Sequence, residues 1–291
     1  MIEQSNIQGQ ASAIPQQEQV ARAWDGIAAG FNRFLTPPNM ELAGDALEIA
    51  GLEAGMRVLD VAAGSGAVTI PAARRGAEVL AVDISPEMVG HLRARARAEG
   101  LDTVEARVMD AYDLELEDDA FDITASQNGV TVLPDLQRGL REMVRVTKPG
   151  GRVLLVAFGP FAEAEFLTFF MRGMQLALPA FDGPPWNGPP LPFQVADAEK
   201  LRRLMAGAGL TDVRVEKRAW KFQLRSGEDL WHVVTKSNPL GGKLVAGLTA
   251  RQKEAVLRAL DGLLAERAGG NGPAVLTNAV NAGVGTCQAG R

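Results

Sequence analysis

The sequence has 291 residues, of which 46% are hydrophobic and 22% charged, a composition typical of a globular protein that buries a sizeable core. This balance excludes a disordered, collagen-like or coiled-coil chain. The formal net charge is −5 and no long basic run occurs, which argues against nucleic acid as the main partner.

The numbers of cysteines and histidines and the lack of long apolar runs indicate which cofactors and which cellular location to expect. The single cysteine, Cys287, allows no internal disulfide, and two histidines argue against a metal site, so we expect no metal. No run of 18 apolar residues occurs, and the Gln-rich start lacks the basic and apolar parts of a secretory signal. We expect a cytoplasmic protein without stable membrane insertion, with a flexible N-terminus over residues 1–20.

From Gly55 onward, short apolar runs alternate with stretches of helical periodicity, a pattern typical of a parallel sheet wrapped by helices. Ser85 and Pro86 predict a helix start, and the paired glycines of residues 148–151 predict a turn after the helix 136–146. Arg93, Arg95 and Arg97 are interpreted as a solvated helix face. Strands are predicted at 57–61, 78–83, 103–108, 120–125, 151–158, 213–215 and 274–285.

Two insertions interrupt the alternation. The first combines an apolar helix over 161–178 with a Pro-rich loop over 179–192, and the aromatic content of this loop favours a lid over disorder. The second is helical, with capping boxes at Ser226 and Thr249. The aromatic residues of both insertions predict a closed pocket for a small, mostly apolar molecule, and the alternative is a homodimer interface.

Residues 58–66 combine a buried strand with a turn of small residues that leads into a helix from Ala67. Such a turn exposes backbone N–H groups, and the missing side chains let a nucleotide-like ligand approach closely. Thr69 stands where a dinucleotide fingerprint has its third glycine, and Asp60 precedes the turn. Both features argue against NAD.

Acidic residues end three successive predicted strands, at Asp60, Asp83 and Asp110. Ligands of open parallel sheets lie beyond the carboxyl ends of the strands, so we expect these three acids to face one crevice. Asp83 is suited to accept the hydroxyl protons of a ribose. Asp110 is suited to accept an exocyclic amino proton of adenine, with Ile84 and Met88 covering the ring. The alternative is that all three are ordinary polar strand ends.

Taken together, these motifs resemble the class I S-adenosylmethionine-dependent methyltransferases, especially the small-molecule type of ubiquinone and menaquinone biosynthesis. The segments that carry the resemblance are 58–66, 82–88, 109–111, 121–128 and 146–151. The resemblance implies an α/β fold with a doubly wound, mostly parallel seven-stranded sheet whose last strand is antiparallel. The implied division is a helical lid at 21–50, a Rossmann-like core at 51–160, a substrate cap at 161–196, a core helix and sixth strand at 197–223, a second helical insertion at 224–272 and a closing strand at 273–291.

The resemblance also implies roles for individual residues. Ala62 stands where the family usually has glycine, and a left-handed turn there costs about 1 kcal/mol. The residues expected to bind the cofactor, S-adenosylmethionine, are Asp60, Ala62, Gly64, Gly66, Asp83, Ile84, Met88, Asp110, Ala111 and Gln127. Substrate contacts are expected at Trp24 and Phe31 in the lid and at Asn128, Trp186 and Phe193.

The activity that the resemblance implies is transfer of a methyl group to an O, N or C nucleophile of a small, largely apolar or aromatic metabolite. Such in-line displacement depends mainly on proximity and desolvation. Where the acceptor needs deprotonation, His232 is the expected base, the alternative being a locally bonded helix histidine, and His91 is assigned to the surface. The alternative functions are a cofactor-binding protein of this fold that does not methylate, such as a natural-product cyclase or a non-catalytic binding module, and a nicotinamide oxidoreductase.

Overall fold

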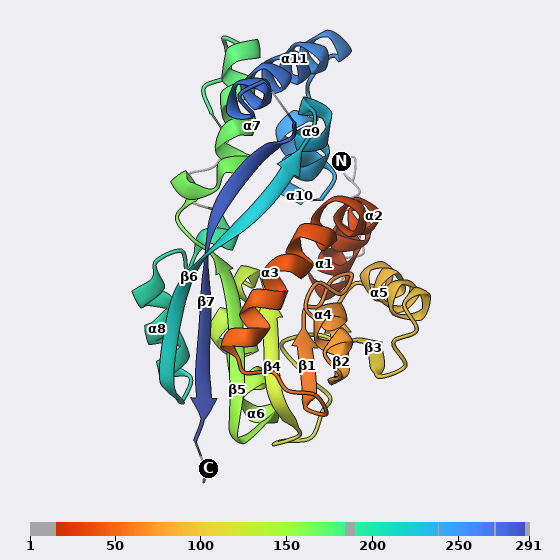
Figure 1. Cartoon of the computed structure of the whole chain (residues 1–291), viewed down its shortest axis with the longest axis vertical. Coiled ribbons are helices and arrows are strands. Elements are labelled where there is room, and N and C mark those ends of the chain that lie inside the picture. The colour runs from red at the N-terminus through yellow and green to blue at the C-terminus, as the bar shows by residue number, and fades with distance from the viewer. Residues whose placement is uncertain (1–15, 184–189, 238, 271, 289–291) are drawn as a thin grey trace, which may run out of the picture.

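The computed structural model describes residues 16–183, 190–237, 239–270 and 272–288. Its centre is a seven-stranded sheet in the order β3-β2-β1-β4-β5-β7-β6, flanked by helices (Figure 1). Strands β1 to β5 run parallel, and β7 is antiparallel to both β5 and β6. The predicted sheet and its antiparallel last strand are therefore confirmed. The strands are β1 Arg57–Val61, β2 Glu78–Asp83, β3 Val104–Val108, β4 Phe121–Gln127, β5 Thr147–Phe158, β6 Leu210–Leu224 and β7 Ala274–Cys287.

The central strands are buried along most of their length, as expected for a sheet covered on both faces. The helices of this core are α4 Thr69–Arg74, α5 Pro86–Ala98, α6 Leu136–Val146 and α8 Ala198–Gly207. Helix α5 begins as predicted, because the Ser85 hydroxyl accepts a hydrogen bond from Met88 N at 3.1 Å and Pro86 takes the first helical position.

Two predicted strands are too short, and one predicted strand end is misplaced relative to Asp110. β5 begins at Thr147 instead of residue 151, because the paired glycines form a bulge: Phe121 pairs with Thr147 and Ile123 with Arg152. β6 runs from 210 to 224 rather than 213 to 215, since β7 supplies a partner along its whole length. β3 ends at Val108 as predicted, so the expectation that Asp110 ends this strand is wrong, because Asp110 follows it by two residues.

The first described part of the chain, residues 16–49, is called the N-terminal segment below. It consists of α1 Gln16–Asp25, α2 Ala28–Gly30, the π-helix η1 Phe31–Leu35 and α3 Thr36–Ile49. Helix α1 thus begins inside the stretch that was predicted to be flexible. Figure 1 places α1 and α2 at the edge of the sheet toward which the β1 arrow points.

Beyond the same edge of the sheet, β6 and β7 continue as a two-stranded arm, paired from Trp220 with Asn278 to Leu224 with Ala274 (Figure 1). This arm carries four helices, called the cap helices: α7 Glu165–Ala177, α9 Gly227–Thr235, α10 Pro239–Val245 and α11 Ala250–Arg267. Both predicted capping boxes are present, at Ser226 and Thr249. Short 3₁₀ turns lie at η2 Val130–Val132, η3 Phe161–Glu163 and η4 Leu191–Phe193. None of the helices in the described ranges is both long and apolar enough to cross a membrane.

Candidate functional site

The turn after β1 adopts the left-handed conformations that its small residues allow. Ala62, Gly64 and Gly66 have φ angles of 56°, 54° and 98°. Ala62 therefore carries the strain expected from its place in the sequence, about 1–2 kcal/mol for a residue with a side chain. A Cβ atom on Gly64 would lie 3.4 Å from Phe31 Cε1, so this glycine lets the N-terminal segment approach the turn closely.

Asp60 stabilises this turn through hydrogen bonds with Thr69. Its side chain is 1% exposed, and its Oδ2 accepts hydrogen bonds from Thr69 N at 3.0 Å and Thr69 Oγ1 at 2.6 Å. Burial raises the pKa of Asp60 to about 7, an effect that the two Thr69 hydrogen bonds oppose and Asp83 increases. Asp60 thus ties β1 to the start of α4, and Thr69, noted in the sequence only as a missing glycine, is its partner.

Asp83 joins the same turn to the next strand. Its Oδ2 accepts a hydrogen bond from Gly64 N at 2.8 Å, and its Oδ1 accepts one from Ser85 N at 2.9 Å. Burial raises its pKa, these two hydrogen bonds oppose the rise, and nearby Asp25 adds to it. Asp25, at the end of α1, accepts hydrogen bonds from Ser85 Oγ at 2.5 Å and Glu87 N at 3.2 Å. The N-terminal segment therefore adds a carboxylate that the sequence interpretation missed.

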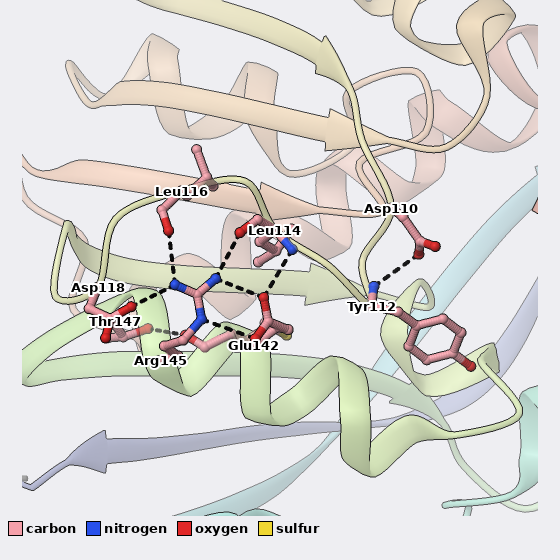
Figure 2. Close-up of polar contacts among 9 residues, drawn as sticks. Asp110, Tyr112, Leu114, Leu116, Asp118, Glu142, Arg145 and Thr147 are labelled. Atoms are coloured by element: carbon pink, nitrogen blue, oxygen red, sulfur yellow. Dashed lines mark hydrogen bonds and ion pairs between the residues drawn. The ribbon is translucent and has the colours of Figure 1, made fainter.

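Asp110 lies in the loop after β3, which Figure 2 shows. Its Oδ1 accepts a hydrogen bond from Tyr112 N at 2.9 Å, and its Oδ2 accepts one from Gln17 Nε2 at 2.6 Å. Helix α1 thus contacts Asp110 near its start and the residues beside Asp83 at its end. Of the two residues expected to cover the adenine ring, Met88 is buried and Ile84 is half-buried, and Ala111, also expected to bind the cofactor, is buried.

At the end of β4, three buried side-chain oxygens have no hydrogen-bond partner among the described residues. They belong to Gln127 (Oε1), Asn128 (Oδ1) and Thr131 (Oγ1). The amide nitrogen of Gln127 is satisfied, because it donates to Asn39 O at 3.0 Å and to Asn39 Oδ1 at 2.9 Å. Buried acceptors of this kind are normally paired, so they indicate a ligand that donates hydrogen bonds.

An aromatic cavity of about 40 Å³ lies at the end of the neighbouring strand β5, where Phe158 is one of its lining residues. Phe158 stands two residues after Val156, whose carbonyl accepts a hydrogen bond from Asn128 N at 2.8 Å. The ring of Phe193 lies 5.1 Å from the rings of both Phe158 and Phe161. The cavity is lined by Phe158, Phe161, Phe166, Leu167, Phe170, Met171, Pro190, Pro192, Phe193, Val234, Gly241 and Leu244.

Of the remaining predicted substrate contacts, two lie in the N-terminal segment and one lies outside the described residues. Trp24 and Phe31 touch each other in the N-terminal segment, with ring centroids 6.3 Å apart in a T-shaped arrangement. Trp186 lies outside the described residues.

His232, the predicted base, lies on α9 beside the N-terminal segment. Its ring stacks on Phe34 with centroids 5.0 Å apart, and its Nε2 lies 4.0 Å from Glu228 Oε1. The His232 ring therefore contacts the N-terminal segment and its own helix α9. The hydrogen-bond partners given above for Asp60 and Asp83 do not include it.

Two assignments to the surface of α5 are wrong. His91 is half-buried, and its Nδ1 lies 3.4 Å from Asn32 Nδ2. Arg95 donates to Asn32 Oδ1 at 2.5 Å and has a buried Nε, so it anchors the N-terminal segment instead of facing solvent. Sequence spacing could not reveal these contacts, because Asn32 comes from a part of the chain about 60 residues away.

The charges of the site fit a cationic ligand. Asp60 and Asp83 are buried with raised pKa values, and Asp25 adds a third carboxylate nearby. Within the described ranges, none of the ion pairs involves these three acids. A positive group would be stabilised here, whereas the pyrophosphate of a dinucleotide would be repelled. In the described part of the chain, no three His, Cys, Asp or Glu side chains lie close enough together to hold a metal ion.

The strand order, the glycine-containing turn and the acids at or just beyond the ends of β1, β2 and β3 define the Rossmann-like methyltransferase class. A family profile described as a methyltransferase domain matches residues 59–155. The uncharacterized protein Rv1405c of Mycobacterium tuberculosis is 43% identical over 109 residues, and this match spans 38% of the chain but only 39% of that relative. A demethylmenaquinone methyltransferase of Mycolicibacterium gilvum is 31% identical over 239 residues, 78% of this chain and 98% of that protein.

The solved structure of the [4+2]-cyclase SpnF shares the fold, with a TM-score of 0.58 at 18% identity over 94% of this chain and 98% of that one. Because the match to the Mycolicibacterium protein covers nearly the whole of that relative, the chain belongs to the class I S-adenosylmethionine-dependent methyltransferases of the quinone-methyltransferase type. S-adenosylmethionine is therefore its cofactor, as predicted.

Proposed function

We propose that this protein transfers a methyl group from S-adenosylmethionine to an O, N or C atom of a small, largely apolar or aromatic metabolite. The observation that carries the proposal is the pair of buried acids Asp60 and Asp83 at the glycine-containing turn, which form no ion pair with any described residue. When bound, S-adenosylmethionine supplies an electrophilic methyl group on a positively charged sulfur, the charge for which these carboxylates are suited.

In this proposal the chain's residues divide the work of binding. Gly64 and Gly66 adopt the left-handed conformations that shape the turn around the donor, and Asp60 fixes this turn through Thr69. Asp83 accepts the ribose hydroxyls with the lone pairs that Gly64 N and Ser85 N leave free. Asp110 accepts a hydrogen bond from the adenine amino group, which takes the place of the Gln17 side-chain amide as donor.

In this proposal the acceptor lies against the unpaired oxygens at the end of β4 and the aromatic residues that line the cavity. Asn128 Oδ1 and Thr131 Oγ1 are buried oxygens that can accept a hydrogen bond from the O–H or N–H group of an acceptor. Phe158 and Phe193 provide an apolar wall that excludes water from the reacting atoms. Most of the rate then comes from positioning and desolvation, and His232 removes a proton where the acceptor requires it.

The proposal is tested by incubating the purified protein with S-adenosylmethionine and a panel of phenol, enol and amine acceptors that carry apolar substituents. We expect at least one methylated product, formed in equal amount with S-adenosylhomocysteine. Phe193→Ala should raise the KM for that acceptor about tenfold, because a buried aromatic wall is lost. Leu191→Ala is the matched control, since Leu191 lies in the same turn but is 44% exposed.

The second candidate is a protein that binds the cofactor without methylating. The packing of His232 against Phe34 favours keeping this alternative, because the ring contacts the N-terminal segment. Binding of S-adenosylhomocysteine combined with no turnover on any acceptor would support it. A chain that binds neither cofactor form would refute both candidates.

A further inference from the structure

We infer that Arg145 is a positioning residue for adenine recognition, because it holds the loop that presents Asp110. The inference rests on the proposed function, in which Asp110 reads the amino group of adenine. Arg145 lies near the end of α6, and Figure 2 shows its guanidinium facing the loop between β3 and β4.

The guanidinium of Arg145 makes five hydrogen bonds, one for each of its N–H donors. Its Nη1 donates to Leu116 O at 2.8 Å and to Asp118 Oδ1 at 2.6 Å, and its Nη2 donates to Leu114 O at 2.8 Å. The other two bonds go to Glu142, from Nε at 3.0 Å and from Nη2 at 2.7 Å. Two of the five acceptors are thus backbone carbonyls of the loop, which fixes the path of its main chain.

Glu142 also holds this loop, and we call the hydrogen-bonded pair of Arg145 and Glu142 the Arg145 bracket. Glu142 Oε2 also accepts a hydrogen bond from Leu114 N at 2.9 Å, so both polar backbone groups of Leu114 are held by this pair of side chains. The Leu114 side chain is buried, 3% exposed, which anchors the same residue from its apolar side. The hydrogen bonds with Arg145 lower the pKa of Glu142, so the pair stays ionised at neutral pH.

The held residues follow Asp110 closely in the chain. Tyr112 N donates to Asp110 Oδ1 at 2.9 Å, which orients the carboxylate, and Asp113 N donates to Asp110 O at 3.1 Å. Tyr112 is itself anchored, because its hydroxyl accepts a hydrogen bond from Asp135 N at 3.0 Å. A shift of the loop at Leu114 would therefore move the Asp110 carboxylate away from the position in which it can accept the adenine proton.

Lysine cannot replace this bracket, because a single ammonium group cannot reach two carbonyls and two carboxylates with planar geometry. The test is Arg145→Lys, with the exposed Arg141 of the same helix changed to Lys as the matched control. Isothermal titration calorimetry measures the dissociation constants of two ligands, S-adenosylhomocysteine and its analogue in which purine replaces adenine. The second ligand lacks the 6-amino group and therefore does not use Asp110.

We expect the wild type and Arg141→Lys to prefer the adenine ligand by about tenfold, the effect of one hydrogen bond to a charged group. In Arg145→Lys this ratio should fall to about twofold, while binding of the purine ligand changes little. A merely structural role would weaken both ligands alike and leave the ratio unchanged. Glu142→Gln, which disturbs the same bracket without removing Arg145, should give the same result and serves if Arg145→Lys does not fold.

An unchanged ratio in the folded variants, or a wild type that binds both ligands equally, would overturn the inference and leave methyl transfer standing. A wild type that binds neither ligand would overturn the proposed function and this inference with it. The readout is a ratio of binding constants, so it does not depend on knowing the acceptor.

Discussion

Asp83→Asn separates the binding role of Asp83 from its structural role. In the wild type, each carboxylate oxygen accepts one backbone hydrogen bond, from Gly64 N at 2.8 Å and from Ser85 N at 2.9 Å. Asparagine keeps one acceptor oxygen and turns an NH₂ group toward the other N–H. Alanine would leave both N–H groups unpaired in a buried place, so its effects on folding and on binding would be harder to separate.

Two opposing terms determine the stability of this variant. One unpaired backbone N–H costs about 1–3 kcal/mol. Against this, the variant no longer buries a carboxylate whose pKa is raised by burial and by Asp25, so part of the loss is offset. We therefore expect the free energy of unfolding to fall by less than about 2 kcal/mol. Loss of the charged acceptor for the ribose hydroxyls costs about 1.5–3 kcal/mol, which weakens cofactor binding roughly 10- to 150-fold.

The assay combines thermal unfolding with calorimetric titration of S-adenosylhomocysteine. Asp102→Ala is the control for loss of a negative charge, since Asp102 is exposed before β3. The expected result is a strong loss of affinity with a small change in melting temperature, for the variant at position 83 only. A folded Asp83→Asn protein with wild-type affinity would refute the assignment of Asp83 to the ribose.

Three further predictions concern pH, packing and the base. Burial raises the pKa of Asp60 from 3.8 to about 7, so between about pH 4 and 7 the folded state binds more protons than the unfolded state, and stability falls as pH rises through that window. Asp60→Asn should flatten this part of the profile in thermal melts, and an unchanged slope would contradict the assignment. Gly129→Ala should cost about 1–3 kcal/mol in urea unfolding, since its Cβ would lie 2.6 Å from Ala62 Cβ. Gly90→Ala, in a helix with no atom within 4 Å of the new Cβ, should instead stabilise by about 0.4–1 kcal/mol. If His232 is the base, His232→Gln should lower kcat about 10²- to 10⁴-fold without changing the affinity for S-adenosylhomocysteine, whereas a loss below threefold would assign the rate to positioning alone.

Local features of the sequence predicted local structure well. The cap at Ser85, the capping boxes at Ser226 and Thr249 and the strands ending at Val61 and Asp83 agree with the structure, because each depends on residues a few positions apart. The β6 strand was predicted too short, since its outer half pairs with β7 in the arm and alternates polar and buried residues instead of forming an apolar run.

The candidate site was predicted less completely, because several of its contacts join distant parts of the chain. Gln17 and Asp110 are 93 positions apart, and Asp25 and Ser85 are 60 apart. Glycine and aspartate patterns predict which strand ends bind a ligand, but they carry no information on which N-terminal residues cover them. The Arg145 bracket has a weak local signal, an arginine three residues after Glu142, that is also typical of an ordinary surface ion pair.

The acid cluster gives a physical reason for the proposed direction of the reaction. Asp60 and Asp83 gain from a positive ligand, because their raised pKa values reflect burial and the repulsion of a neighbouring carboxylate, which a nearby cation relieves. Methyl transfer removes the positive charge from the sulfur of the donor, so the product no longer compensates these carboxylates. The same residues that favour binding of the donor therefore hold the product less strongly, and the site favours exchange of product for a new donor.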